Sequence, residues 1–288
     1  MAATQRCELL VIGGGNMGSA IIRGGLAAGV LRAAAVCVVD PDAGKRAAMT
    51  AHGCVAAGAI SHVPQVAELT SDTLVLWAVK PQMFADAAAA YRVVVAGLAA
   101  GGQPAAGASI MAGVPASRVS ELTGTACIIR TMPNLPAQIG RGVTAICTPS
   151  QAGVAGSPAA AATRRVTTLL EAVGSVIELP EPMLDAFTAL AGSGPAYMFY
   201  LAEAMVAAAL EQGLTAEQAD LAVRQTLLGA AQLMSQRADA SPTQLRAEVT
   251  SKGGTTAAAT AVMDAAGFTE LIKRAIAAGT ERSRELRG

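Results

Sequence analysis

The segment Gly13-Gly14-Gly15-Asn16-Met17-Gly18 constrains the fold more than any other feature, because it separates two different hydrophobic patterns. Residues 7–12 form a short apolar run typical of a buried strand, and apolar side chains recur at helical spacing after the glycines. Gly13 permits a tight turn, Gly15 lets the backbone approach a pyrophosphate, and Gly18 lets the helix pack closely on the strand. The segment therefore predicts a dinucleotide-binding turn, with the phosphates at the N-terminus of the helix.

An ordinary glycine-rich turn would need no acidic residue downstream, but a second predicted strand, 35–39, ends at Asp40. Asp40 follows the last glycine at close to the spacing of roughly 20 residues expected for a carboxylate that binds ribose hydroxyls. We therefore expect an N-terminal α/β domain of the Rossmann type. Asp40 favours NADH, because a carboxylate repels the 2′-phosphate of NADPH, while Lys45 and Arg46 are placed to offset that repulsion.

Strand and helix patterns continue to alternate up to residue 181. Further strands are expected over 73–79, 108–111, 127–131, 143–147 and 175–179, with a helix over 159–173. Ligands of such sheets bind beyond the carboxyl ends of the strands. The residues that fall there are Lys80, Pro81, Ala112, Gly113, Arg130 and Asn134.

Several of these residues also have a structural interpretation. Lys80 could be a solvated loop charge, Pro81 could simply begin a helix, and Arg130 could belong to a structural ion pair. Asn134 stands in a loop with prolines on both sides, which makes the loop rigid and extended. We expect its amide to point toward the nicotinamide end of a coenzyme.

From residue 182 onward only helical patterns remain, so we expect a domain of residues 1–181 followed by an all-α domain of residues 182–288. Helices are expected over 195–212, after capping boxes at Thr215–Gln218 and Ser241–Gln244, over 255–267 and over 268–287. The stretches 195–210 and 221–234 are apolar nearly all round and must be buried on every side. A domain of this size cannot bury them alone, so we expect an intertwined dimer. Its core and interface would include Met183, Met198, Met205, Met234 and Met263.

Composition narrows the possible partners. Hydrophobic residues make up 52% of the chain and charged residues 15%, which excludes disorder, and 21 basic residues balance 21 acidic ones, which argues against nucleic acid or an anionic membrane as a partner. A mean hydropathy of +0.44 raises the alternative of a membrane span. The strongest candidate, 195–210, is shorter than the roughly 20 residues needed and contains Glu203. The N-terminus shows no basic region before an apolar run, so we expect no signal peptide.

The cysteines are not spaced for metal binding. They are Cys7, Cys37, Cys54, Cys127 and Cys147. They form no CxxC pair, and His52 and His62 are the sole histidines, so we expect no metal site. Free thiols fit a reducing compartment, and we expect a cytoplasmic protein.

The segment Thr250-Ser251-Lys252-Gly253-Gly254-Thr255-Thr256 interrupts the apolar helices. Its two glycines expose backbone N–H groups beside a helix N-terminus, with hydroxyl side chains nearby, which predicts an anion-binding pocket. The alternative is a plain turn between helices with Thr255 as the N-cap. The number of hydroxyl residues favours the ligand site.

Together these features resemble the pyrroline-5-carboxylate reductases. The resemblance covers nearly the whole chain, through GGGNMG, AVKPQ, SIMAGV, RTMPNLPA, AGSGPAY, QTLLGAAQLM and VTSKGGTT in that order. The first motif is common to Rossmann enzymes, whereas RTMPNLPA, AGSGPAY and VTSKGGTT are much more specific. The resemblance implies a C-terminal dimerisation domain, an active site between the domains with contributions from two subunits, and assembly that often reaches a decamer.

The resemblance also implies the reaction and its residues. NADPH or NADH would transfer a hydride from nicotinamide C4 to the C=N carbon of 1-pyrroline-5-carboxylate, which is the last step of proline biosynthesis. Thr256 would be catalytic, by hydrogen bonding the ring nitrogen. Substrate would be held by Ser251, Gly253, Gly254, Thr255 and Thr256, and coenzyme by Gly13, Gly15, Asn16, Met17, Gly18, Asp40, Ala78, Val79, Lys80, Pro81, Ala112, Gly113 and Asn134.

Two positions depart from the family pattern. Lys252 stands where many members have proline, and Gly18 where many have alanine, and we expect either type to suit the same backbone turn at each position. Lys252 would add positive charge near the substrate carboxylate.

Two other functions remain as alternatives. A β-hydroxyacid dehydrogenase also joins a Rossmann domain to helices, but it needs a lysine on a helix face, whereas Lys252 lies in a loop. A non-enzymatic NAD(P)-sensing protein would bind the nucleotide without turnover.

Overall fold

The computed structural model describes residues 6–65, 69–98 and 102–286. The chain forms two compact units, one of residues 1–192 with 279–288 and one of residues 193–278. The boundary expected from the sequence, between 181 and 182, marks where strand patterns end. The structure instead places residues 182–192, and the end of the last helix, in the unit that contains the sheet. Each unit is described separately.

Within its described residues, the first unit contains an eight-stranded sheet in the order β3-β2-β1-β4-β5-β6-β7-β8. The strands are β1 (Leu9–Ile12), β2 (Val36–Val39), β3 (Val55–Ala57), β4 (Leu74–Trp77), β5 (Ala106–Ser109), β6 (Cys127–Met132), β7 (Gly142–Cys147) and β8 (Gly174–Glu178). Neighbours are parallel except β6 and β7, which are antiparallel. The carboxyl ends of β1, β2, β4 and β5 therefore meet at one edge of the sheet.

Strands β1 and β4 are shorter than the predicted 7–12 and 73–79, and two other strands differ more from the sequence prediction. The short strand β3 was not predicted, and β5 begins and ends two residues earlier than the predicted 108–111. The residues of β5 are small, with the sequence AGAS, so hydrophobicity placed the strand over the bulkier residues that follow.

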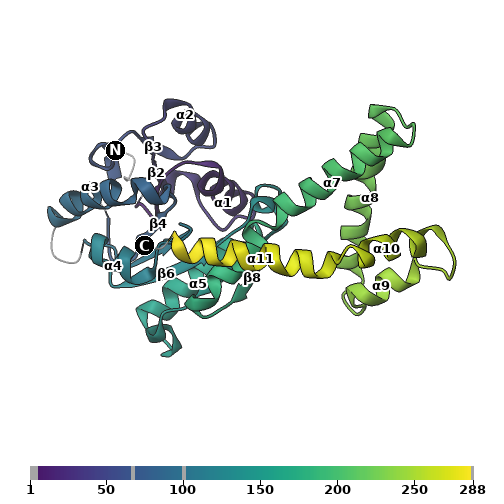
Figure 1. Ribbon diagram of the computed structural model, residues 1–288. Helices are drawn as coiled ribbons and strands as arrows, with labels where there is room; N and C mark the ends of the chain where they lie inside the picture. Colours follow the sequence, from purple (N-terminus) through teal and green to yellow (C-terminus); the bar gives the residue numbers. More distant parts are fainter. Residues whose placement is uncertain (1–5, 66–68, 99–101, 287–288) are drawn as a thin grey trace. The chain divides into compact units, whose positions relative to one another are not determined.

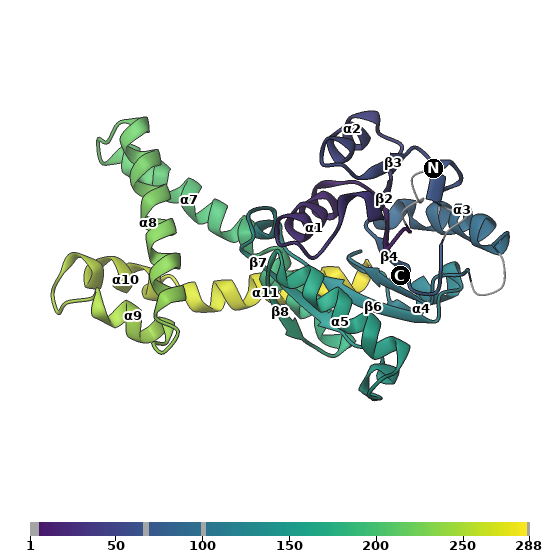
Figure 2. The same cartoon turned by 180° about the vertical axis from the view of Figure 1, so that it is seen from behind.

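Helices cover both faces of this sheet (Figures 1 and 2). They are α1 (Asn16–Ala27), α2 (Ala43–Ala51), α3 (Phe84–Ala96), α4 (Ala116–Thr123), α5 (Pro158–Glu171) and α6 (Leu184–Phe187). Strand β1 shows how the faces divide, because Leu9 and Val11 pack in a core with α1 and α5, while Leu10 and Ile12 pack in a core with α3 and α4. Alternate side chains of a strand point to opposite faces, so β1 is apolar throughout because both faces are covered.

Shorter helical turns connect these elements. They include the 3-10 turns η1 (Ala33–Ala35), η2 (Ile60–His62), η4 (Pro81–Met83), η5 (Leu135–Ile139), η6 (Ser150–Gly153) and η7 (Glu181–Met183), and the π-helical turn η8 (Thr188–Gly192). The turn η4 follows β4 directly and places Lys80 and Pro81 at the carboxyl edge of the sheet. The expectation that Pro81 begins a helical turn is confirmed.

The second unit is helical, as expected. It contains α7 (Gly194–Glu211), α8 (Ala216–Gln236), α9 (Pro242–Glu248), α10 (Thr255–Ala265) and most of α11 (Phe268–Glu285), whose last turns belong to the first unit. Both predicted capping boxes are confirmed: Thr215 Oγ1 accepts from the Gln218 N–H at 3.2 Å, and Ser241 Oγ accepts from the Gln244 N–H at 3.3 Å. The fold class is therefore an N-terminal Rossmann-like sheet followed by a helical region.

The helices of the second unit leave large apolar side chains exposed in a single chain. Helices α7 and α10 bury none of their described residues, and α8 buries Ala219 and Val223. Exposed positions include Met198, Phe199, Tyr200, Leu221, Leu228, Val262 and Met263. Apolar patches of this extent mark a surface that another macromolecule covers.

Among the helices of the described residues, none combines the length and the apolarity that crossing a membrane requires.

Candidate functional site: two clefts at the carboxyl edge of the sheet

The glycine turn between β1 and α1 is shaped by close backbone contacts. Gly13 has φ +105°, and a methyl group built on it would lie 2.6 Å from the Ala78 carbonyl oxygen. Gly15 is different, because a methyl group there would meet nothing within 4 Å. Gly13 therefore serves the backbone turn, while Gly15 leaves an open face at the helix N-terminus, where a phosphate can approach.

Gly18 packs inside the first turn of α1. A methyl group built there would lie 2.7 Å from the Gly13 carbonyl oxygen and 3.2 Å from the Ala78 side chain. The expectation that alanine suits the same backbone at this position is wrong for this chain, since the turn would have to shift to admit it.

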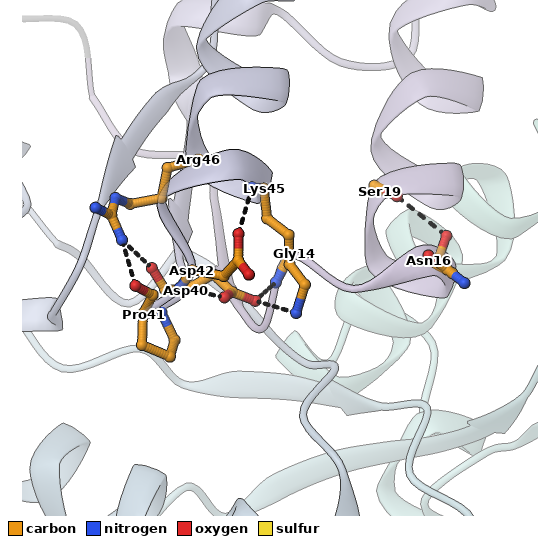
Figure 3. A network of polar contacts seen from close by, with 8 residues as sticks. All are labelled: Gly14, Asn16, Ser19, Asp40, Pro41, Asp42, Lys45 and Arg46. Atoms are coloured by element: carbon orange, nitrogen blue, oxygen red, sulfur yellow. Dashed lines mark hydrogen bonds and ion pairs between the residues drawn. The ribbon is translucent and has the colours of Figure 1, made fainter.

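Asp40 directly follows β2 and is 4% exposed. Its Oδ2 accepts from the Gly14 N–H at 2.8 Å and lies 3.5 Å from the Lys45 Nζ, and its Oδ1 accepts from the Asp42 N–H at 2.9 Å. Figure 3 shows this carboxylate between the glycine turn and the start of α2. Asp40 thus joins the two loops that flank the site, and its charge is balanced by backbone dipoles and by Lys45.

The start of α2 is held by hydrogen bonds to an N-cap residue and from a side chain of the helix itself. Asp42 is the N-cap and accepts from the Lys45 N–H at 2.9 Å, a bond that lowers the pKa of the Asp42 carboxyl. Arg46 donates through Nη1 to the carbonyls of Asp40 and Pro41 at 2.9 and 2.7 Å (Figure 3). Arg46 is therefore engaged in holding the loop, whereas Lys45 projects into the neighbouring clefts.

A cleft of about 580 Å³ lies over the carboxyl ends of β1, β2 and β4. Its lining includes Gly13, Gly15, Asp40, Lys45, Ala78, Val79 and Lys80. Apolar walls come from Ile12, Val39, Ile60 and Met83. The combination of apolar walls with a few polar groups is typical of a site for a flat, partly apolar ligand such as a nucleoside.

A second cleft, of about 490 Å³, continues from the first toward β5. It shares Gly15, Lys45, Ala78, Val79 and Lys80 with the first, and it adds Asn16, Met17, Pro81, Ile110, Met111 and Ala112. The shared residues surround the open face of Gly15. The arrangement fits a dinucleotide with its pyrophosphate at the glycine turn and one nucleoside half in each cleft.

Ten of the residues expected at the coenzyme site line these clefts. They are Gly13, Gly15, Asn16, Met17, Asp40, Ala78, Val79, Lys80, Pro81 and Ala112. Lys45, which was expected only to offset the charge of Asp40, also lines both clefts. Gly18, Gly113 and Asn134 are not among the lining residues of either cleft. Sequence reasoning did not single out Ile60, Gln82, Met83, Asp86, Ile110 or Met111, although Ile110 and Met111 lie inside the motif SIMAGV.

Asn134 does not use its amide as expected. Its Nδ2 donates to the Ala191 carbonyl at 3.1 Å, and its Oδ1 accepts from the Val143 N–H at 2.9 Å. The side chain is buried and joins the loop after β6 to β7 and to the turn η8. The amide is therefore directed at the scaffold, because the neighbouring backbone groups need partners when buried.

Arg130 follows the structural alternative. Its guanidinium is 4% exposed and lies 2.9 Å from Glu181 Oε1, an oxygen that also accepts from the Ala116 N–H at 2.9 Å. Glu181 thus ties the buried arginine of β6 to the first turn of α4. Arg130 is a scaffold residue in this structure rather than a residue at the clefts.

The predicted substrate segment lies in the second unit, between α9 and α10. Gly253 has φ +74°, and the Gly254 N–H donates to the Ser251 carbonyl at 3.0 Å, so the chain makes a tight turn before α10. The N-cap of α10 is Gly254, with no side-chain cap, and the expectation of Thr255 as N-cap is wrong. The hydroxyls of Thr255 and Thr256 make no hydrogen bond within the described residues.

Comparison with known proteins agrees with this geometry. Residues 181–286 match the model of pyrroline-5-carboxylate reductase dimerisation, and residues 8–98 match the model described as NADP oxidoreductase coenzyme F420-dependent. The pyrroline-5-carboxylate reductase of Pseudomonas aeruginosa is 37% identical over 97% of this chain and 96% of the relative, and that of Synechocystis sp. is 35% identical over 97% and 98%.

Solved structures show the same similarity. The pyrroline-5-carboxylate reductase of Coxiella burnetii superposes with a TM-score of 0.82 at 29% identity, over 99% of this chain and 100% of that one. The fold is also that of the Plasmodium falciparum enzyme solved with NADP bound, with a TM-score of 0.78 at 22% identity over 99% and 100%. With its Rossmann-type clefts, its helical region and these full-length relatives, the chain belongs to the pyrroline-5-carboxylate reductase family of NAD(P)-dependent oxidoreductases.

Proposed function

We propose that this protein reduces 1-pyrroline-5-carboxylate to proline with NADPH or NADH bound across the two clefts. The observation that carries the proposal is the open face of Gly15 at the N-terminus of α1, shared by both clefts. The adenosine half fits the cleft beside Asp40, and the nicotinamide half fits the cleft that reaches Ala112. The coenzyme supplies the hydride, and the residues of the chain orient it and shield it from water.

We place the substrate at the segment 250–256. The resemblance assigns its carboxylate and ring nitrogen to Ser251, Gly253, Gly254, Thr255 and Thr256. The structure supports this assignment through backbone N–H groups at the start of α10 and through threonine hydroxyls that lack a partner among the described residues. A protonated imine carries its own activating charge, so the task of Thr256 is to hold the ring nitrogen in line for hydride attack.

Residues 182–288 act as the dimerisation and substrate domain in this proposal. Helices α7 and α10 expose apolar side chains along their length, which supports burial against a second copy. We therefore propose a homodimer, with the active site completed by two subunits, and further association of dimers up to a decamer. The five free thiols support a cytoplasmic location.

We propose further that NADH serves at least as well as NADPH. Asp40 stands at the end of β2, where ribose hydroxyls bind, and a 2′-phosphate would meet its charge. Lys45, 3.5 Å from Asp40, offsets part of that charge, so the preference is expected to be small.

The deciding experiment is an assay of NADH and NADPH oxidation with the cyclic imine, run side by side. Turnover with formation of proline supports the proposal. Coenzyme binding without turnover would instead indicate a nucleotide-sensing protein, and turnover of a β-hydroxyacid with no imine reduction would indicate the dehydrogenase. A kcat/KM a hundredfold higher with NADPH would contradict the proposed coenzyme preference while leaving the reaction intact.

A further inference from the structure

The turn between β5 and α4, residues 110–116, forms the far wall of the second cleft and is held by segments distant in the sequence. At one end, the Ala116 N–H donates to the Glu181 carboxylate at 2.9 Å. In its middle, Gly113 has φ +73°, and a methyl group built on it would lie 3.3 Å from the Leu286 carbonyl oxygen. The last described residue of the chain therefore lies directly against the turn that carries Ala112 into the cleft.

The end of α11 is anchored where it reaches this turn. Ser283 is the one described residue of α11 that is buried, and its Oγ donates to Asp185 Oδ1 at 2.9 Å. Asp185 is 1% exposed. A carboxylate that is buried to this extent is retained only where hydrogen bonds compensate the loss of solvent, so the Ser283 hydroxyl contributes to fixing the last turn of α11.

We propose that the C-terminal turn of α11, residues 281–286, is a positioning element for the coenzyme. The hydrogen bond between Ser283 and Asp185 fixes this turn to α6. The Leu286 backbone packs against Gly113. This contact determines the position of Ala112 in the second cleft. The inference rests on the proposed function, since it takes that cleft as the site of the nicotinamide half. The residues of the turn touch no reacting atom; they act through the 110–116 segment.

The main test removes residues 286–288 by a stop after Glu285. We expect the KM for the coenzyme to rise roughly five- to tenfold, with kcat and the KM for the imine nearly unchanged, because the loss affects alignment of the wall rather than the reacting groups. Leu286→Ala is the matched control, since it keeps the backbone carbonyl and Cβ that face Gly113, and its coenzyme KM should equal that of the unaltered enzyme.

A second pair of variants tests the anchor without shortening the chain. Ser283→Ala removes the donor to Asp185, while Arg282→Ala changes its neighbour, whose side chain forms an exposed ion pair with Glu285. We expect Ser283→Ala alone to raise the coenzyme KM. A melting curve on each variant shows whether the effect on KM exceeds any loss of stability.

The inference is overturned if the shortened chain folds and keeps the original coenzyme KM. If the shortened chain does not fold, the inference is overturned when Ser283→Ala keeps that KM. It is also overturned if the KM values for coenzyme and imine rise together, because that result indicates a general loss of structure. Fluorescence titration with NADH separates this result from failure of the proposed function. If the unaltered protein binds NADH but does not reduce the imine, the proposed function is wrong. The titration then still compares the NADH affinities of the variants with that of the unaltered protein.

Discussion

The clefts of the first unit and the 250–256 segment of the second unit are built in opposite ways. At the clefts, the buried carboxylate of Asp40 has partners within the chain through Gly14, Asp42 and Lys45. In the second unit, Thr255 and Thr256 hold hydroxyls without a hydrogen bond among the described residues, and the helices around them expose apolar faces. A single chain therefore completes the first region and leaves the second one open.

The difference indicates which of the two regions depends on the association of subunits. A preorganised cleft is ready to bind when the first unit folds, because its loops are already fixed by internal bonds. Exposed apolar helices gain their stability only when they are covered. Under the proposed function, coenzyme binding should survive changes that abolish catalysis by preventing assembly.

The largest expected effect comes from charging the exposed face of α8. Leu221 and Leu228 stand two helical turns apart and are 69% and 52% exposed in the single chain. The double change Leu221→Glu and Leu228→Glu should dissociate the proposed dimer and remove imine reduction, since burying one leucine contributes roughly 1.5–3 kcal/mol and a buried unpaired charge costs more. Sedimentation velocity and the imine assay measure both consequences.

Val93→Glu is the control for this change, because Val93 is 77% exposed on α3 in the first unit. It should alter neither size nor activity. A double variant of α8 that remains an active dimer would show that this face of α8 is not the surface that the second copy covers.

The next effect compares two glycines of the same turn. Gly13→Ala forces a side chain into a positive-φ position against the Ala78 carbonyl, which costs on the order of 1–3 kcal/mol and should lower the Tm by several degrees. Gly15→Ala meets no neighbour, so the Tm should hold while coenzyme affinity falls, because the methyl group enters the open face where the pyrophosphate is expected. Equal coenzyme affinity in Gly15→Ala and the unaltered protein would argue against that placement.

A smaller effect is expected at Thr256, in the open region. Thr256→Val keeps the shape of the side chain but removes the hydroxyl, which should cost roughly 1–3 kcal/mol, or about 5- to 150-fold in kcat/KM for the imine. Coenzyme affinity and Tm should hold, because Gly254 rather than either threonine is the N-cap.

Thr260→Val is the matched control for this variant, one turn further along α10. The Thr260 hydroxyl donates to the Thr256 carbonyl at 2.9 Å, so its loss affects the helix and not a ligand. Normal kinetics in Thr256→Val, or a loss of activity that follows a loss of Tm, would favour a plain turn between helices over a substrate contact.

The smallest effect concerns Lys45, which is 47% exposed. Lys45→Ala should raise the KM for NADPH more than that for NADH, by up to roughly fivefold, because an exposed charge pair contributes about 0.2–1 kcal/mol and only NADPH carries the additional phosphate. Steady-state kinetics with both coenzymes at low salt measure the ratio, and Lys273→Ala, far along the sequence on α11, serves as the surface control. An unchanged ratio would place the 2′-phosphate away from Lys45.

Local sequence signals predicted the parts of the structure that local interactions determine. The glycine turn and the capping boxes at Thr215 and Ser241 depend on residues a few positions apart, and the structure has them as predicted. The start of β5 was misplaced because its small residues carry a weak hydrophobic signal. The N-cap of α10 was assigned to Thr255 by residue preference, but Gly254 makes the turn there.

Long-range pairings could not be predicted in this way. Asn134 bonds to Ala191 and Arg130 pairs with Glu181, across separations of more than fifty residues. Nothing beside Asn134 in the sequence indicates that its amide faces the scaffold, because the partners are backbone groups brought near by the fold. The ligand roles of the site residues stay predictions, and the variants above test them.

The sole tryptophan of the chain, Trp77, gives the molecule a built-in optical reporter. Its indole is fully buried at the end of β4, packed edge-on against Phe84 and Tyr91 with ring centroids 5.3 and 5.2 Å away. Ala78, the next residue, lines both clefts. Light emitted by this one indole is therefore produced beside the proposed coenzyme site, and a reduced nicotinamide ring bound there can absorb it. Quenching of that emission would report occupancy of the first unit alone, without a label and without any signal from the helices that follow.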